Sequence, residues 1–151
     1  SPVVAREALL ELVSHARQEL IIYSQELDPM LFDHEQLAAQ VSRVARLHAR
    51  NRVRILLHQS QRARESAHRL LALHRRLPSK LQLRLAHGEL RDADATYVVA
   101  DGRGVLVLPR YTEYRGFVYM NNAVLARQRL EEFGYLWARG GADPDLRTLS
   151  V

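Results

Sequence analysis

Apolar residues recur along the chain in blocks that predict alternating helices and strands. Leu9, Leu12, Val13 and Ala16 follow helical spacing, and Ser1 with Pro2 can start a helix, so we expect a helix over about residues 2–18. The apolar and β-branched run at 19–24 then predicts a short buried strand.

The next two helix–strand units follow the same rule. Asp33 and Gln36 have the spacing of a capping box and predict a helix over 36–50, with Leu37, Val41, Val44 and His48 on one face. The segment 52–58 predicts a second strand. A third helix is expected over 63–77, ending at Pro78, with these residues inward: Ala67, Leu70, Leu71, Leu77. The alternating segment 80–86 predicts a third strand near a sheet edge.

The last part of the chain predicts antiparallel structure. Strands at 96–100 and 104–109 flank Asp101-Gly102, a pair typical of tight hairpins, and a further strand is expected at 115–120. A final helix over 123–139 has Asn122 as its cap and carries Ala126, Leu130, Phe133 and Trp137 on one stripe.

This order predicts one α/β domain with a mixed β-sheet of about six strands and helices on both faces. We expect the domain to cover residues 1–139 and a C-terminal tail to cover 140–151. The chain begins with Ser-Pro instead of Met, which favours a piece of a longer polypeptide.

Composition narrows the chemistry. The 151 residues contain no cysteine, which excludes disulfides, thiolate metal sites and cysteine nucleophiles. No apolar run is long enough to span a membrane, and no secretion signal is visible, so a cytoplasmic location is expected. Lys80 is the one lysine among 22 basic residues, and the net charge is +5. An arginine bias of this kind is typical of GC-rich bacterial genomes as much as of an anionic partner.

The layout, and the strand that enters a hairpin at Asp101-Gly102, resemble the phospholipase D-like fold, whose domains carry an HxKxxxxD motif on such a strand. The resemblance places the family's His at Asp94 and its Lys at Thr96, and keeps the Asp as Asp101. In the family the His is the nucleophile and the Lys binds phosphate.

An acid and a hydroxyl cannot replace an imidazole and an ammonium in phosphodiester chemistry. The Gly-Ser-x-Asn segment that often follows the motif is also absent, because Leu-Val-Leu-Pro-Arg-Tyr-Thr-Glu-Tyr stands there. We therefore expect a non-catalytic accessory module of a larger bacterial protein, similar to uncharacterised domains attached to acetyltransferase-like proteins. Its partner is expected to be another domain of the same polypeptide, with a homodimer as a second option. Asp101 alone is also explained as an ordinary turn residue.

Other residues leave alternatives open. Tyr23, Gln25, His58 and His87 end predicted strands at one sheet edge and are candidate ligand-binding residues, or the site of a divergent hydrolase. A polyanion such as nucleic acid is a further, less favoured partner, with six candidate arginines: Arg43, Arg46, Arg50, Arg62, Arg69, Arg76. The segment 111–122 holds tyrosines suited to a protein contact. An Asp92–Asp94 metal pair is not favoured, and no metal or cofactor is expected.

Overall fold

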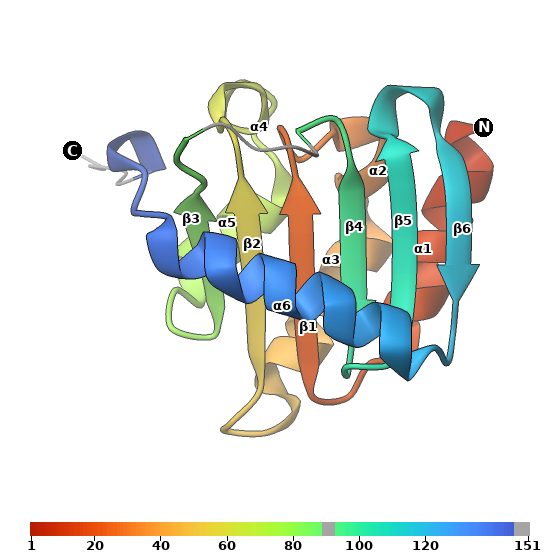
Figure 1. The fold of residues 1–151 in the computed structure, drawn as a ribbon. Helices are drawn as coiled ribbons and strands as arrows, with labels where there is room; N and C mark the ends of the chain where they lie inside the picture. The colour runs from red at the N-terminus through yellow and green to blue at the C-terminus, as the bar shows by residue number, and fades with distance from the viewer. Residues whose placement is uncertain (89–92, 147–151) are drawn as a thin grey trace.

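A computed structural model describes residues 1–88 and 93–146 of the chain and shows a six-stranded sheet in the order β3-β2-β1-β4-β5-β6 (Figure 1). Strands β1, β2 and β3 are mutually parallel, whereas β4, β5 and β6 form an antiparallel meander joined to β1 through β4. The strand bounds are β1 Glu19–Ser24, β2 Arg52–Leu57, β3 Leu81–Leu85, β4 Thr96–Ala100, β5 Gly104–Arg110 and β6 Arg115–Tyr119. The predicted mixed α/β sheet is therefore confirmed.

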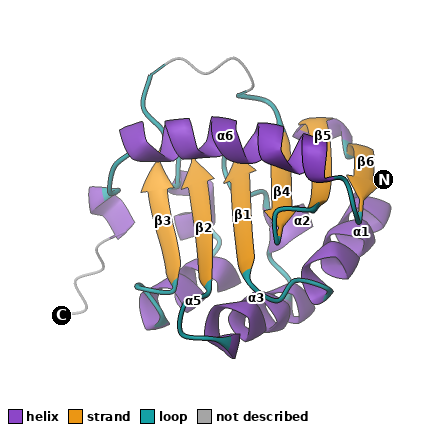
Figure 2. Cartoon of the chain, turned by 60° about the horizontal axis from the view of Figure 1, so that its bottom comes forward, coloured by secondary structure: helices purple, strands orange, loops and turns teal. Residues whose placement is uncertain are grey.

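Helices cover both faces of the sheet, as predicted (Figure 2). Five of them lie on one face: α1 Pro2–Ser14, α2 Pro29–Phe32, α3 Glu35–Leu47, α4 Gln61–Glu65 and α5 Arg69–Arg76. Helix α6, Ala123–Arg139, crosses the other face and begins at Asn122, whose side chain accepts the Leu125 N–H. Two single-turn 3₁₀ helices follow β5 and α6, at Tyr111–Glu113 and Pro144–Leu146.

The predicted helix over 63–77 is wrong in one respect, because the segment forms two helices. Helix α4 ends in a Schellman motif, in which His68 N–H donates to the Ala63 carbonyl and Ala67 N–H donates to the Arg64 carbonyl. Ala67 takes a left-handed φ of 50° there and is exposed instead of pointing inward. The side chain of His68 then starts α5 by accepting the Leu70 N–H.

Four further expectations need correction at or near helix ends. Helix α1 stops at Ser14 instead of about residue 18, and the loop before Asp33 contains the short helix α2. The capping box at Asp33 is wrong, because His34 occupies the N-cap of α3 and the Asp33 carboxylate accepts the Arg69 N–H of α5 instead. His48, expected on the inner face of its helix, is the exposed C-cap of α3.

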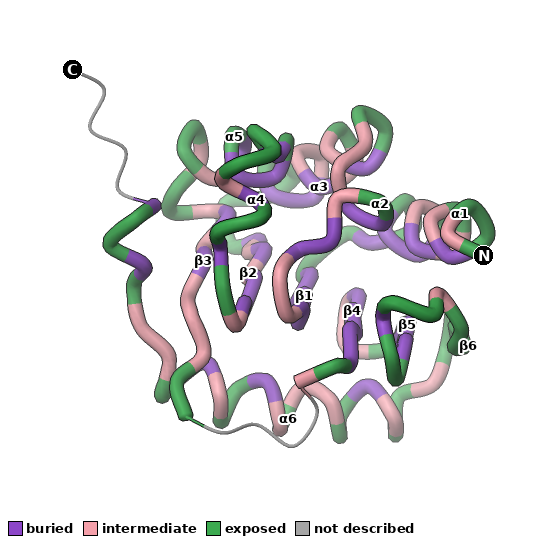
Figure 3. The backbone as a smooth tube through the Cα atoms, turned by 90° about the horizontal axis from the view of Figure 1, so that it is seen from above, coloured by how far each residue is buried: buried purple, intermediate pink, exposed green. Residues whose placement is uncertain are grey.

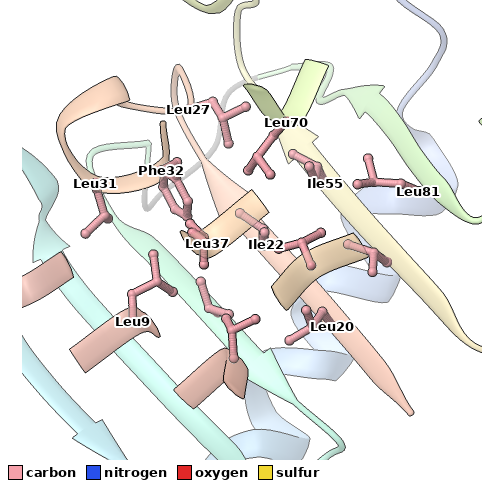
Figure 4. Close-up of a cluster of buried hydrophobic side chains, with 14 of the residues drawn as sticks. Leu9, Leu20, Ile22, Leu27, Leu31, Phe32, Leu37, Ile55, Leu70 and Leu81 are labelled. Atoms are coloured by element: carbon pink, nitrogen blue, oxygen red, sulfur yellow. The ribbon is translucent and has the colours of Figure 1, made fainter. Parts of the chain in front are cut away.

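Two apolar clusters hold the layers together. The larger lies between the sheet and helices α1–α5, which are together on one side of the sheet in Figure 3. Side chains such as Leu9, Ile22, Phe32 and Ile55 are buried there (Figure 4). The smaller lies under α6 and includes Phe133 and Trp137. Because β1 and β4 contribute to both clusters, the centre of the sheet is rigidly held on its two faces.

Residues expected to form a tail pack against the β3 side of the sheet. Gly141 forms a β-bridge with Leu85, and the buried side chains of Ser60 and Asp143 hydrogen-bond to one another. None of the helices in the described part of the chain combines the length and apolar character needed to cross a membrane.

Candidate functional site

The three motif positions lie at opposite ends of β4. Asp94 and Thr96 stand where β4 begins, at the edge where β1, β2 and β3 end, which we call the carboxyl edge. Asp101 follows the last residue of β4, at the edge where β1–β3 begin, which we call the amino edge. A strand of five residues spans roughly 17 Å, so Asp101 is remote from the other two positions.

Asp101 has a structural task at the amino edge. Its carboxylate accepts three backbone hydrogen bonds, from Arg17 at 2.9 Å, from Gln18 at 2.8 Å and from Glu19 at 3.0 Å. Its own N–H donates to the Glu19 carbonyl, and its φ of 54° opens the β4–β5 turn, followed by Gly102 at 67°. The side chain thus closes the α1–β1 connection onto the hairpin, in addition to the turn role expected from the sequence.

The carboxyl edge carries a connected group of charged and phenolic side chains, which we call the carboxyl-edge cluster: Glu26, Asp28, Arg62, Tyr111 and Tyr114. Arg62 lies 2.7 Å from the Glu26 carboxylate and 3.6 Å from that of Asp28. The Tyr111 hydroxyl donates to Glu26 and lies 2.9 Å from the side-chain oxygen of Gln25, and the Tyr114 hydroxyl donates to Asp28. Asp28 is buried and also caps α2 through the Met30 N–H. Each phenol therefore has a carboxylate acceptor.

The titration behaviour of the cluster follows from these contacts. Burial raises the pKa of Tyr114 to about 12, helped by the hydrogen bond to Asp28 and its negative charge. Burial also raises the pKa of Tyr111, with Glu26 acting in the same direction. For Glu26, burial opposes ionisation, but hydrogen bonds from Tyr111 and Arg62 outweigh it and lower the pKa. At neutral pH the cluster therefore holds neutral phenols, ionised Glu26 and cationic Arg62.

The cluster adjoins the degenerate motif positions. The Tyr111 N–H donates to the Asp94 carbonyl at 2.9 Å, which ties the start of the first 3₁₀ turn to the segment before β4. Thr96 is fully enclosed, and its hydroxyl has no hydrogen-bond partner among the described residues. The Asp94 side chain is exposed. The Lys position is thus buried and uncharged, while the His position carries an acid.

The four candidate ligand-binding residues divide into separate places. Tyr23 Oη and His58 Nε2 lie 2.8 Å apart, and the Tyr23 ring stacks on Tyr97 under α6. Burial lowers the pKa of His58, so its imidazole is neutral near pH 7. Gln25 instead contacts Tyr111, and His87 is exposed beside Gly141.

The six candidate arginines are also spread over the molecule. Arg43 donates to the carbonyls of Val13, Ser14 and Ala16 and so caps the end of α1. At the carboxyl edge, Arg62 belongs to the cluster above, and Arg69 pairs with Asp33 at 3.1 Å. Arg46, Arg50 and Arg76 are exposed at or just beyond the ends of α3 and α5, at the amino edge.

Sequence reasoning missed the carboxyl-edge cluster. Glu26 and Asp28 follow the first strand directly after Gln25, so the rule that selected Gln25 could have found them. Tyr111 and Tyr114 carried no such signal, because their approach to β1 depends on the 3₁₀ turn after β5. The Asp92–Asp94 pair, which the sequence did not favour as a metal site, includes a residue outside the described part of the chain. Within that part, no group of three or more His, Asp or Glu residues has metal-binding geometry.

Solved structures place this architecture in a known class. NucT from Helicobacter pylori is similar with a TM-score of 0.63 and 12% identity, over 94% of this chain and 92% of that one. The structure described as "TrmBL2, an archaeal chromatin protein, shows a novel mode of DNA binding" matches with a TM-score of 0.60 and 17% identity, over 91% of this chain. The matched region is 50% of the TrmBL2 chain, so this chain spans about half of its length. The fold is phospholipase D-like, as the sequence predicted.

Within that fold class, the chain belongs to the family described as "Domain of unknown function (DUF7931)", whose model matches residues 1–149. No curated protein sequence matches the chain.

Proposed function

We propose that this domain is a non-catalytic, phospholipase D-like accessory module of a larger bacterial polypeptide, in the cytoplasm, and that it acts by binding a protein partner. The observation that supports the loss of catalysis is the chemistry at the carboxyl edge. Glu26 and Asp28 occupy it beside Asp94, and the cation next to them, Arg62, is already paired with both cluster carboxylates. A phosphodiester approaching this edge would meet uncompensated negative charge.

A nucleophile is also lacking in the required place. The position of the family's attacking imidazole carries Asp94, and His58, which follows β2 at this edge, is engaged with the buried Tyr23 hydroxyl. Asp101, the one motif residue that the sequence retains, is occupied by three backbone N–H groups at the far end of β4. The retained aspartate therefore supports the fold instead of the chemistry.

Hydrolysis of bis(p-nitrophenyl) phosphate by the purified domain tests this proposal. We expect no turnover above the uncatalysed rate. Turnover that is lost in His58→Ala but kept in His15→Ala would establish the divergent hydrolase instead, because His15 is an exposed helix-end residue remote in the fold from the carboxyl edge. The same hydrolysis assay on Tyr111→Phe, which removes a cluster hydroxyl without changing net charge, should likewise show no turnover.

Edge strand β6 is the surface that we assign to protein binding. Its residues are all exposed, and three consecutive ones are large and apolar: Phe117, Val118 and Tyr119. Because they alternate between the two faces of the strand, apolar surface flanks both sides of a backbone edge that no other described strand covers. An extended segment from another domain of the same polypeptide, or β6 of a second copy, can add a strand to such an edge.

Light scattering coupled to size exclusion distinguishes these two partners. A dimer that dissociates in Tyr119→Lys identifies a second copy as the partner. A monomer whose β6 amides become protected from exchange when it is joined to its neighbouring domain identifies that domain instead. If wild type is monomeric and joining it to its neighbouring domain leaves β6 amides exchanging freely with deuterium, the assignment of β6 is wrong. Gln128→Lys, on the exposed side of α6, adds the same charge as a control.

A further inference from the structure

A cationic groove lies at the amino edge of the sheet, opposite to the edge that carries the motif positions. It measures about 400 Å³ and is lined by residues of the α1–β1 loop, the α3–β2 connection and the first halves of β1 and β2. Its charged lining consists of Arg50, Arg52, Arg54 and Glu19. Three arginines thus line one hollow together with a single acidic residue.

Two of the three guanidinium groups are held in place by neutral acceptors. Arg52 donates to the carbonyls of Ala49 at 3.0 Å and Asn51 at 2.7 Å. Arg54 donates to the Gln82 side chain at 3.2 Å, and its guanidinium carbon lies 5.7 Å from the centre of the Trp137 ring. An arginine has five N–H donors, so each keeps donors for an anion. Since their orientation is already fixed, binding an anion costs little additional side-chain entropy.

The third guanidinium and the carboxylate leave the groove positively charged. Arg50 makes no hydrogen bond or ion pair with any residue of the described chain. Glu19 is the register partner of Arg52 on β1, yet no cation in the described residues lies within ion-pair distance of its carboxylate. One acid therefore opposes three bases without forming a closed pair with any of them.

Helix termini do not explain these arginines. A base in the last turn of a helix stabilises the helix dipole, which accounts for Arg46 in α3 and for Arg76 in α5. Arg50 lies beyond the end of α3, and Arg52 and Arg54 belong to strand β2, where no such dipole acts. The contacts with Gln82 and Trp137 orient Arg54 but do not neutralise its charge, so the excess of basic residues around one hollow favours an anionic ligand.

The surroundings of the groove suit a chain of anions better than a single one. Further bases continue along the same edge on both sides, at the helix ends just named and at Arg17, Lys80 and Arg103. A flat membrane surface would reach the protruding bases but not charges recessed in a hollow, whereas a strand of phosphodiesters can enter it. We propose that this groove binds the phosphate backbone of single-stranded nucleic acid, with Arg50 and Arg54 as the main phosphate-binding residues.

This inference does not depend on the proposed loss of catalysis or on the role of β6. Binding of the full chain to a labelled oligothymidylate of about 12 nucleotides can be measured by fluorescence anisotropy. For three contacted phosphates, the logarithm of the binding constant should fall against the logarithm of salt concentration with a slope of about −2. Arg50→Glu should weaken binding at least about tenfold in low salt, and Arg54→Gln several-fold.

The matched control is Arg110→Glu, which makes the same charge change at the far end of β5, where Arg110 is highly exposed. It should change affinity by less than about twofold, and circular dichroism should show all variants folded. An equal loss in Arg50→Glu and Arg110→Glu would mean diffuse charge attraction and would refute the groove. No binding at about 20 mM salt would also refute it.

Two further experiments distinguish a nucleic-acid backbone from a membrane surface and from a single phosphate-containing anion. Vesicles containing phosphatidylserine should not bind the protein under conditions where the oligonucleotide does, and the reverse result would replace nucleic acid by a membrane. If pyrophosphate displaces the oligonucleotide at equal phosphate concentration, the groove is a single-anion site and the proposal of a polymer is wrong.

Discussion

The carboxylate of Asp101 accepts the backbone N–H of Arg17 at 2.9 Å, across 84 positions of sequence. With the N–H groups of Gln18 and Glu19 on the same carboxylate, this contact joins the entry to β1 to the β4–β5 hairpin. A single aspartate thus adds a side-chain link at one end of the β1–β4 pairing, which joins the parallel and antiparallel halves of the sheet.

Replacing this aspartate should destabilise the fold. Asp101→Ala leaves three N–H donors without their charged acceptor and puts alanine at a positive φ, so we expect the free energy of unfolding to fall by about 2–4 kcal/mol. Asp101→Asn should cost less, because the amide keeps one acceptor oxygen and tolerates the left-handed conformation. Urea unfolding measures both variants.

Asp94→Ala is the matched control for this loss. The Asp94 side chain is exposed, and its contact with Tyr111 runs through the backbone, so the change should stay within about 0.5 kcal/mol. If Asp94→Ala destabilised the protein as much as Asp101→Ala, the structural role assigned to Asp101 would not be specific.

The sequence predicted the sheet well because its strands are short apolar runs with clear boundaries. The runs at 19–24 and 96–100 match β1 and β4 at both ends, and Asn122 starts α6 as expected. What it could not give were contacts that depend on the assembled sheet, such as Asp33 with Arg69 or Tyr111 with Glu26, which join residues 36 and 85 positions apart. Likewise, three arginines around one groove become visible only when the α3–β2 connection is folded against β1.

The hydroxyl of Tyr114 should produce a pH dependence at the alkaline end. Its pKa rises from 10.0 to about 12 through burial and the hydrogen bond to Asp28, so folding stabilises the neutral phenol. That contribution is complete below pH 10 and is lost as the pH rises toward 12. At about pH 11 the phenolate absorbance near 295 nm should therefore be nearly equal in wild type and in Tyr114→Phe, because Tyr114 is still mostly neutral there. A loss of about one phenolate in Tyr114→Phe would contradict the bond.

The Asp33 carboxylate should stabilise the start of α5 in a pH-dependent manner. It accepts the Arg69 N–H at 3.0 Å and the Arg69 side chain at 3.1 Å. Burial opposes ionisation of Asp33, but the Arg69 backbone bond and nearby positive charge outweigh it and lower the pKa. The stabilisation is therefore present above the ordinary carboxyl pKa of 3.8 and disappears as the pH falls through the lowered value.

Asp33→Ala should cost about 1 kcal/mol at neutral pH and flatten the acid limb of the stability curve, measured by urea unfolding against pH. Gln36→Ala separates this contact from the capping box suggested by the sequence. Since Gln36 is exposed and His34 occupies the N-cap, that change should stay within about 0.5 kcal/mol. If Gln36→Ala lowered the free energy of unfolding more than Asp33→Ala does, the capping box predicted from the sequence would be supported instead.

The break between α4 and α5 predicts opposite effects for one and the same substitution. Ala67 occupies the left-handed position of the Schellman motif, where the sequence lacks the glycine that usually marks such an ending. Ala67→Gly should relieve backbone strain and stabilise the protein by roughly 0.5–1 kcal/mol. Ala72→Gly, at an exposed position inside α5, should destabilise it by about 1 kcal/mol. Thermal unfolding that shifts in the same direction for both variants would mean that one continuous helix runs through this segment.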